Sequence, residues 1–429
     1  MQNPISIAWF RRDLRIEDHR ALFEAQKLGL PILPLFIFDT DILDKLKAED
    51  ARITFIHQHL ALLHQYFASF GSQMLCLKGT PQAVWQQLCT EFDIAHVFFH
   101  QDFEPYALAR DQKVSTLLAN NNIRVHSFLD HILFAPGQIL KDDQTPYTVY
   151  TPFRKKWESL FHQNLLSSFP SEKNFDHYVS LPTYNFPSLG DIGFVKSSIE
   201  VKPYRLEHLA NYAHQRNFPA EDEGSYLSPH LRFGTVSIRK VVQIAQKYPV
   251  FLHEIIWRSF FIHILYFFPK VVSHNFKAKY DVLEWRVDEA NFAKWCEGKT
   301  GYPLVDAGMR QLNATGYMHN RVRMITASFL CKHLLIDWRW GEAYFAEKLL
   351  DFELASNNGN WQWVAGTGCD AAPYFRIFNP AEQQKKFDPK AVYIRQWVKE
   401  FDDFGYPAPI VEHTFARERA LNFYQKINA

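Results

Sequence analysis

Four polar side chains stand shortly before a tryptophan pair in the segment "LLDFELASNNGNWQW", residues 349–363. They are Asp351, Glu353, Asn357 and Asn358, and the first tryptophan is Trp361. Carboxylates and amides hydrogen-bond to polar ligands, and indole rings stack on planar ones. A helix that only fills a core would not place so many polar groups beside its largest apolar side chains. The segment therefore predicts one wall of a polar, aromatic-lined cofactor pocket.

The segment "FLHEIIWRSFF", residues 251–261, places a carboxyl, an indole and a guanidinium on one helix face. Glu254, Trp257, Arg258 and Phe261 have the spacing i, i+3, i+4, i+7. One interpretation is a buried Glu254–Arg258 ion pair beneath aromatic rings. The other is a cleft wall, in which Trp257 stacks on a base and Glu254 reaches the polar edge of that base. The residues by themselves leave both interpretations open.

A third polar face occurs in "TGYMHNRVRMITASF", residues 315–329. Asn320, Arg323 and Met324 lie at i, i+3 and i+4, so an amide, a guanidinium and a thioether share one side of an otherwise apolar helix. Arg323 is available to Asp351 or to a phosphate. This polar interruption favours a ligand over simple packing.

The segment "GSYLSPHLRFG", residues 224–234, offers hydroxyl and backbone N–H groups at a predicted helix start. Gly224, Ser225 and Ser228 suit phosphate oxygens at such a position. The simpler alternative is that Ser228 caps the helix and Pro229 takes its first position. Packing is likewise the default for three well-separated tryptophans, whose spacing alone assigns them no role: Trp285, Trp338 and Trp361.

The elements that must position these residues change in kind along the chain. Up to about residue 130, short strand patterns alternate with helical patterns, which predicts a doubly wound parallel sheet. The predicted strands are 5–10, 31–38, 74–79, 96–101 and 124–128, and no GxGxxG follows the first. Prolines interrupt residues 131–204, which are predicted to be an interdomain linker. Helical spacing dominates residues 205–429, which are predicted to form an all-helical domain.

Length and composition are consistent with two globular domains. The chain has 429 residues, of which 47% are hydrophobic, and this excludes wholesale disorder. Residues 1–200 hold 18 Lys and Arg against 22 Asp and Glu, a net of −4, and the remainder holds 29 against 24, a net of +5. A polyanion is therefore expected to bind the C-terminal half.

The cysteines show whether a metal site is expected, and the apolar runs show whether a membrane span or a signal peptide is expected. The five cysteines form no CxxC pair, so zinc, iron–sulfur and disulfide frameworks are not predicted, nor is any other metal site. The apolar run "SFFIHILYFFP" is shorter than a membrane span, and the N-terminal run is too short for a signal peptide. A cytoplasmic protein without a membrane partner is expected.

Several of these segments together resemble the photolyase/cryptochrome family over nearly the whole chain. "WFRRDLRIEDHRAL" resembles its N-terminal signature. The others follow in the family's order: "RNFPAEDEGSYLSPHLRFG", "EIIWRSFF", "GKTGYPLVDAGMRQLNATGYMHNRVRMITASFL", "DWRWGE" and "ASNNGNWQWVAGTGCDAAPYFRIFNP". The resemblance implies an N-terminal α/β antenna domain (1–130), a linker (131–204) and an all-helical domain that binds FAD (205–429).

The resemblance also implies roles for individual residues. FAD would be held by Tyr212, Gly224, Ser225, Leu227, Ser228, Arg258, Arg323, Asp351, Glu353 and Asn357, with Asn357 facing the flavin N5 atom. Electron transfer to the flavin would use Trp285, Trp338 and Trp361. The damaged DNA would meet Glu254, Trp257, Asn320, Arg321 and Met324. Glu353 departs from the family, which usually has Asp at this position.

The implied activity is light-driven splitting of cyclobutane pyrimidine dimers in UV-damaged DNA, with the dimer flipped out of the stack towards reduced FAD. The alternatives are a cryptochrome-type blue-light receptor, a (6-4) photoproduct photolyase and, with less support, a light-independent flavin oxidoreductase. A second, antenna chromophore is left open, because Tyr106 and Ala107 stand where a folate binder would have Asn-Glu. The protein is expected to be a monomer.

Overall fold

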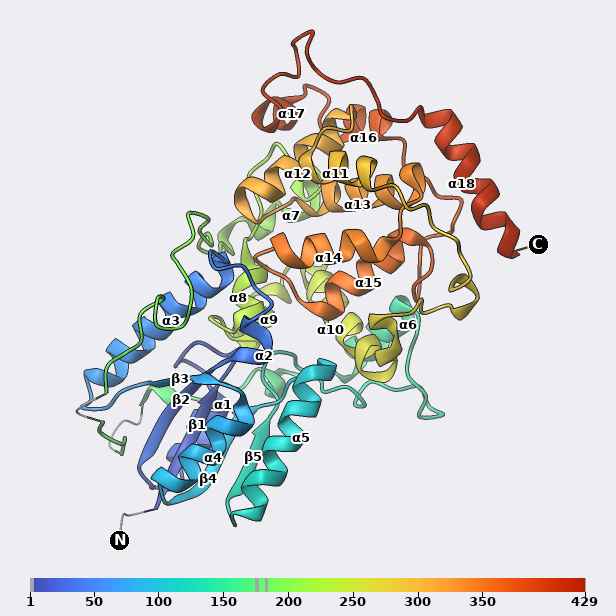
Figure 1. The fold of residues 1–429 in the computed structure, drawn as a ribbon. Helices are drawn as coiled ribbons and strands as arrows, with labels where there is room; N and C mark the ends of the chain where they lie inside the picture. Colours follow the sequence, from blue (N-terminus) through green and yellow to red (C-terminus); the bar gives the residue numbers. More distant parts are fainter. Residues whose placement is uncertain (1–3, 174–176, 182–183, 429) are drawn as a thin grey trace. The chain divides into compact units, whose positions relative to one another are not determined.

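The computed structural model describes residues 4–173, 177–181 and 184–428, which form two compact units (Figure 1). Unit 1 comprises Met1–Gln138, Leu160–Pro203 and Leu227–Lys247. Unit 2 comprises Ile139–Ser159, Tyr204–Tyr226 and Tyr248–Ala429. The chain thus passes between the units more often than one linker requires. The boundaries at residues 130 and 204, which would separate an antenna domain, a linker and an FAD-binding domain, stay a prediction.

Unit 1 contains a five-stranded parallel sheet with the strand order β3-β2-β1-β4-β5. The strands are β1 (Ile5–Phe10), β2 (Ile32–Asp39), β3 (Leu75–Gly79), β4 (Ile94–His100) and β5 (Arg124–Phe128). Every residue of β1 and β2 is buried, as expected of central strands that are covered on both faces. The predicted doubly wound sheet is confirmed, and each strand lies within two residues of its expected position.

Helices cover both faces of this sheet. One core joins the helices α1 (Arg20–Gln26) and α3 (Ala51–Ala68) to β1 and β2, and a second core joins α4 (Pro81–Glu91) and α5 (Pro105–Asn120) to the opposite face. Three short helices complete the α-helices of the unit, namely α2 (Thr40–Leu43), α8 (Leu227–Phe233) and α9 (Ile238–Ala245), with 3₁₀ turns at Gln163–Leu166 and Ser171–Lys173.

A buried network of ion pairs attaches α9 to the sheet. Arg15 lies 2.6 Å from Asp130, and Arg239 of α9 lies 2.8 Å from Asp18 and 2.9 Å from Asp130. The neighbouring guanidinium groups hold the pKa of Asp130 well below its usual value despite its burial. These pairs explain why Leu227–Lys247 packs in unit 1, although its helical pattern resembles that of the C-terminal region.

A second buried polar group in unit 1 has the composition of a metal site. The Asp13 carboxylate lies 2.6 Å from His100 Nδ1 and 3.0 Å from His19 Nε2. The other nitrogen of each ring accepts a backbone N–H, from Ala21 and Leu22 respectively, at 3.1 Å. Because every ring nitrogen already faces a protein partner, the geometry describes a network that ties the loop after β1 to α1 and β4.

Unit 2 is helical, as predicted. Its α-helices are α6 (Tyr150–Leu160), α7 (Tyr212–Gln215), α10 (Pro249–Phe267), α11 (Glu289–Glu297), α12 (Pro303–Thr315), α13 (Asn320–Ser328), α14 (Trp338–Lys348), α15 (Leu354–Ala365), α16 (Pro380–Phe387), α17 (Val392–Trp397) and α18 (His413–Asn428). A π-helix, η6 (Phe329–Leu334), continues α13, and short 3₁₀ turns occur at Glu207–Ala210, Pro269–Val272 and Ala278–Tyr280. The helix α6 lies inside the stretch that the sequence pattern assigned to a linker.

Among the described residues, α10 is the one helix long and apolar enough to cross a membrane by length and composition. The apolar run expected to be too short is thus part of a longer helix. This is weak evidence for a span, because a buried core helix passes the same test. Nine residues of α10 are buried within the protein, and the helix packs against α15, so its apolar composition is explained by burial.

Two glycines set how closely the central helices of unit 2 approach. A Cβ atom added at Gly341 of α14 would lie 2.1 Å from the Trp361 ring, and one added at Gly359 of α15 would lie 2.1 Å from the Phe261 ring. Both rings are part of packed cores, so neither has room to move aside. The glycines therefore place α15 directly against α14 and α10, which lie beside it in Figure 1.

We expect Gly341→Ala to destabilise the protein. The alanine gains about 1 kcal/mol of helix propensity. Overpacking against a buried indole costs about 1–3 kcal/mol, and a contact this short falls at the upper end of that range. Denaturant unfolding of Gly341→Ala, Gly405→Ala and the wild type measures the difference, since nothing lies within 4 Å of a Cβ added at Gly405. A Gly341→Ala protein as stable as the control would contradict the packing argument.

Candidate active site

The first turn of α15 and the residues just before it are held by two ion pairs. Arg258 of α10 lies 2.7 Å from Glu353, and Arg323 of α13 lies 2.8 Å from Asp351. The side chains of Glu353 and Asp351 are only 5% and 7% exposed, so each carboxylate depends on its arginine. The Arg323–Asp351 contact, considered from the sequence, is present. Both carboxylate oxygens of Glu353, which is one methylene longer than the Asp usual in the family, have a partner, because the second oxygen accepts from the Ser356 hydroxyl at 3.1 Å.

Asn357, one turn further along α15, is fixed by a neighbour on α14. Its Nδ2 donates to the backbone oxygen of Glu342 at 3.0 Å and to the Glu342 carboxylate at 2.8 Å. Asn358 points elsewhere and donates to the backbone oxygen of Val271. No described residue donates to Asn357 Oδ1, so this carbonyl is the group that α15 offers to a ligand N–H donor.

Glu254 forms an ion pair that the sequence did not indicate. Arg216, which follows α7, donates to the Glu254 carboxylate at 2.7 Å. The interpretation of a Glu254–Arg258 pair is therefore wrong, because each residue finds a partner from a distant segment. Burial raises the pKa of Glu254, and Arg216 partly opposes this by favouring the charged form.

Trp257 meets a partner from the stretch predicted to be a linker. Its ring stacks on Tyr150 of α6 with a centroid distance of 3.6 Å and an interplanar angle of 8°. Tyr150 is fixed in turn, because its hydroxyl donates to the backbone oxygen of His253 at 2.9 Å. One indole face is thus occupied within the protein. The amphipathic spacing of Tyr150, Phe153 and Trp157 in "YTPFRKKW" was a signal that could have revealed α6.

Further arginines lie near Arg216, the partner of Glu254. Arg321 donates to the Asn217 side chain at 2.6 Å and contacts the Met324 sulfur at 3.7 Å. Burial lowers the pKa of Arg321, and the charges of Arg216 and Arg376 lower it further, which places three guanidinium groups in one region.

His319 caps α13 in the same region. Its Nδ1 accepts the backbone N–H of Arg321 at 3.2 Å, and burial together with the nearby arginines lowers its pKa to about 4. His319 is therefore neutral at pH 7. Asn320, the next residue, is exposed.

The three tryptophans belong to one apolar cluster of unit 2, in which Trp338 and Trp361 are buried and Trp285 packs against the buried residues. Trp361 rests on α14 at Gly341, and Trp338 begins the same helix one turn earlier. Trp338 is buried, and its Nε1 donates to the Asn275 side chain at 2.9 Å. The residue after Trp285 donates its backbone N–H to Leu335 at 2.8 Å, three residues before Trp338. Trp285 itself is half-buried, so it is the most exposed of the three.

The residues expected at the phosphate end divide between the two units. Tyr212, Gly224 and Ser225 belong to unit 2, and Leu227 and Ser228 begin α8 in unit 1. Since α8 begins at Leu227, Ser228 lies in the first turn and does not cap the helix, contrary to the simpler alternative. The role of these five residues stays a prediction.

Comparison with known proteins agrees with this arrangement. Residues 6–172 match the family model described as DNA photolyase, and residues 251–405 match the model described as the FAD binding domain of DNA photolyase. The chain is 37% identical to a deoxyribodipyrimidine photo-lyase of Synechococcus sp., over 100% of this chain and 98% of that protein. The chain belongs to the DNA photolyase/cryptochrome family.

Two solved structures share the fold of this photolyase-family chain. A bacterial class III photolyase from Agrobacterium tumefaciens matches with a TM-score of 0.90 and 33% identity, over 100% of this chain and 98% of that one. An archaeal photolyase from Sulfolobus tokodaii, solved with two FAD molecules, matches with a TM-score of 0.84 and 32% identity, over 98% and 99%. Its second FAD is described as a novel light-harvesting cofactor.

The donor set of unit 2 fits FAD. Asn357 Oδ1 is an acceptor, and a reduced flavin carries an N–H at N5. The Arg323 side chain is about a quarter exposed. Besides its pair with Asp351, it can still donate a hydrogen bond to the polar edge of a flavin ring. The acidic partners of Arg258 and Arg323 fix these side chains before any ligand arrives.

We expect Arg258→Met to destabilise the protein by about 3–5 kcal/mol, because Glu353 would remain buried without its cation. The double variant Arg258→Met/Glu353→Gln should recover part of this loss. Lys385→Met is the control, since its exposed pair with Glu382 contributes less than about 1 kcal/mol. Denaturant unfolding, with bound FAD measured on each preparation, gives the values. Equal effects of Arg258→Met and Lys385→Met would show that the buried pair has no special weight.

Proposed function

We infer that this chain is a light-dependent DNA repair lyase that splits cyclobutane pyrimidine dimers. The observation that carries the inference is the arrangement on α10. Glu254 and Arg258 are one helical turn apart, with Cβ atoms about 5–6 Å from each other. Glu254 is paired with Arg216, whose charge also acts on Arg321, and Arg258 holds the start of the helix that presents Asn357. This arrangement supports a lesion site next to a flavin site.

FAD, when bound, reduced and excited by light, supplies the electron that opens the dimer. The residues proposed to hold it are Tyr212, Gly224, Ser225, Leu227, Ser228, Arg258, Arg323, Asp351, Glu353 and Asn357. In this set Asn357 accepts from the flavin N5 position, and the pairs Arg258–Glu353 and Arg323–Asp351 fix the side chains around the ring system. Trp361, Trp338 and Trp285 are proposed to carry electrons inward to the flavin.

Glu254 is proposed to hydrogen-bond the dimer where negative charge develops. A protonated Glu254 donates to a carbonyl oxygen, and an ionised Glu254 accepts an N–H of the base. Burial already raises its pKa, and a base that excludes water from the site raises it further. Arg216 acts in the opposite direction while it stays paired. Trp257, Asn320 and Met324 are proposed to line the cavity.

Arg216, Arg321 and Arg376 are proposed to bind the phosphates of the DNA substrate. The dimer is proposed to flip out of the stack towards Glu254. Binding should therefore weaken as salt rises. We propose a reducing cytoplasm as the compartment, because all five cysteines are free thiols. The protein is further proposed to be a monomer. Unit 1 is proposed as the antenna domain, with a second chromophore of unidentified kind.

The test is repair by the purified, photoreduced protein mixed with UV-irradiated oligothymidylate. We expect the thymine absorbance to recover under blue light and to stay constant in the dark. A protein that binds and photoreduces its flavin without this recovery would instead be a (6-4) enzyme or a receptor. Oligonucleotides carrying the (6-4) lesion separate those two outcomes.

We expect Glu254→Ala to lower the repair yield per absorbed photon by about 10- to 100-fold, the value of a lost charge-assisted hydrogen bond. FAD content should not change, because no ion pair of α15 involves Glu254. Glu200→Ala, an exposed acid of unit 1, serves as the control. Unchanged repair would disprove the role of Glu254.

The pH profile distinguishes the two forms of Glu254. If the protonated acid donates, repair falls as the pH rises through its raised pKa, and Glu254→Gln retains a donor and flattens this fall. If the carboxylate accepts, repair falls instead as the pH drops through the same pKa.

A further inference from the structure

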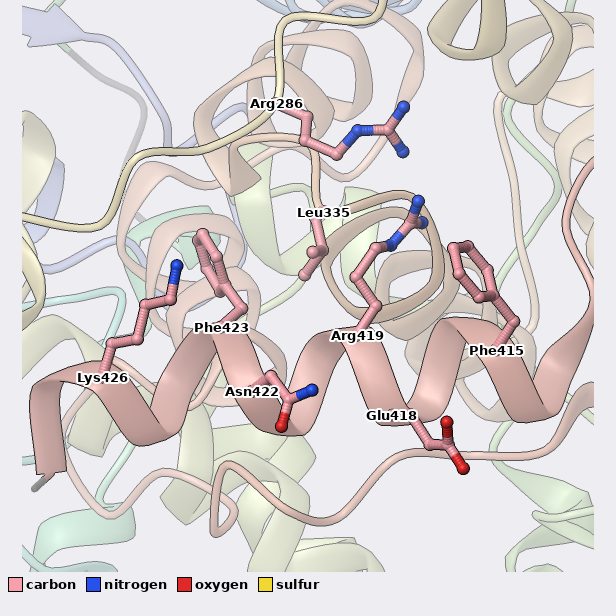
Figure 2. A pocket seen from close by; sticks show the side chains of 8 residues that line it. All are labelled: Arg286, Leu335, Phe415, Glu418, Arg419, Asn422, Phe423 and Lys426. Carbon is pink, nitrogen blue, oxygen red and sulfur yellow. The ribbon is translucent and has the colours of Figure 1, made fainter.

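A pocket of about 440 Å³ lies along one face of the last helix of unit 2, and none of the residues assigned above is among those that line it (Figure 2). Its floor is formed by α18, and its opposite wall by Arg286 and Leu335. The volume is within the range of small-molecule sites. We call it the α18 pocket.

The α18 pocket is basic. Arg286, Arg419 and Lys426 line it, against one carboxylate, Glu418. Figure 2 shows the guanidinium groups of Arg286 and Arg419 near each other above α18, whereas Glu418 points to the opposite side of the helix. Burial lowers the pKa of Arg419 and the charge of Arg286 lowers it further, whereas the charge of Asp288 opposes both.

The cations of the pocket are fixed to different degrees. Arg286 donates to the backbone oxygen of Leu334 at 3.3 Å and pairs with Asp288 at 3.1 Å, and Arg419 donates to the backbone oxygen of His333. Lys426 is exposed and forms no ion pair with any described residue. An anion that enters would therefore meet two pre-positioned guanidinium groups and one mobile ammonium.

The aromatic wall of the pocket contacts Trp285. Phe423 lines the pocket, and its ring centroid lies 5.3 Å from that of Trp285. Arg286, the next residue in the chain, lines the same pocket. Trp285 is also the most exposed of the three tryptophans that are proposed to carry electrons. A ligand in the pocket would thus be separated from this indole by a single ring.

We propose that the α18 pocket binds a small organic anion that acts as a one-electron reductant of Trp285. The proposal rests on the electron-carrying role proposed for the three tryptophans. When Trp285 has lost one electron inward, it is an indole radical cation. The bound anion gives it one electron, which restores the neutral indole, and releases the proton of its own hydroxyl or thiol to water. The oxidised donor leaves as a radical, so charge and electrons balance.

Binding is tested on the FAD-loaded protein by calorimetry with ascorbate, a monoanion at neutral pH. At low ionic strength we expect a dissociation constant on the order of 1 mM or below. Lys426→Glu should weaken it about fivefold, because an attractive charge becomes repulsive, and Lys113→Glu of unit 1 gives the same change in net charge outside the pocket. The proposal would be overturned if neither variant lost affinity for ascorbate, or if both variants lost it equally.

Function is tested by the rate at which the flavin becomes reduced under light. With ascorbate the rate should reach half of its maximum at a concentration equal to the calorimetric dissociation constant. At ascorbate concentrations below saturation, Lys426→Glu should lower the rate about fivefold. With dithiothreitol, which is mostly uncharged at pH 7, the two proteins should not differ. Saturable ascorbate binding that leaves the rate of Lys426→Glu unchanged would also overturn the proposal.

The variant Trp285→Phe distinguishes the proposed donor site from the proposed electron-carrying role of the tryptophans. If Trp285→Phe leaves photoreduction unchanged with both donors, the electron-carrying role of Trp285 is wrong, and the proposed donor site falls with it. If Trp285→Phe lowers the rate with both donors, whereas Lys426→Glu acts with neither, the tryptophan role stands and the donor site alone is wrong.

Discussion

The close approach of three helices at two glycines is the constraint on which the candidate site depends. Without a Cβ at Gly341 and Gly359, α15 lies directly against α14 and α10. This contact brings Asn357 within hydrogen-bond distance of Glu342 and places the Trp361 ring on the helix that begins with Trp338. The unusual sequence before the tryptophan pair is thus explained, since its glycine permits the packing and its amides serve the neighbouring helices.

Three carboxylates of the candidate site in unit 2 are each paired with a different arginine. Arg258 and Arg323 hold the two acids that precede α15, and Arg216 holds Glu254. Removing Arg258 would leave the buried Glu353 without its cation, whereas the Glu254 side chain is partly exposed to water. The pairs therefore keep side chains in place around a ligand while the helices contribute most of the apolar burial.

Electrostatics also connect the candidate site to the protein surface. Arginines lie close together around Arg216 and line the α18 pocket, yet neither group is visible in the net charge of +1. Acidic partners within unit 1 and on exposed helices balance the total. A nearly neutral chain can thus present local basic sites, because the potential near a surface depends on the neighbouring charges more than on the sum.

The sequence by itself determined the parallel sheet, the helical C-terminal region, the family and the faces on which Glu254, Arg323 and Asn357 lie. Hydrophobic periodicity and motif order carry that information locally. Only the tertiary structure decided the partners. Arg216 pairs with Glu254, Arg258 reaches Glu353, and Tyr150 stacks on Trp257. Helical spacing shows which residues share a face, but the residue opposite comes from a segment up to about a hundred positions away, and its identity depends on how the helices pack.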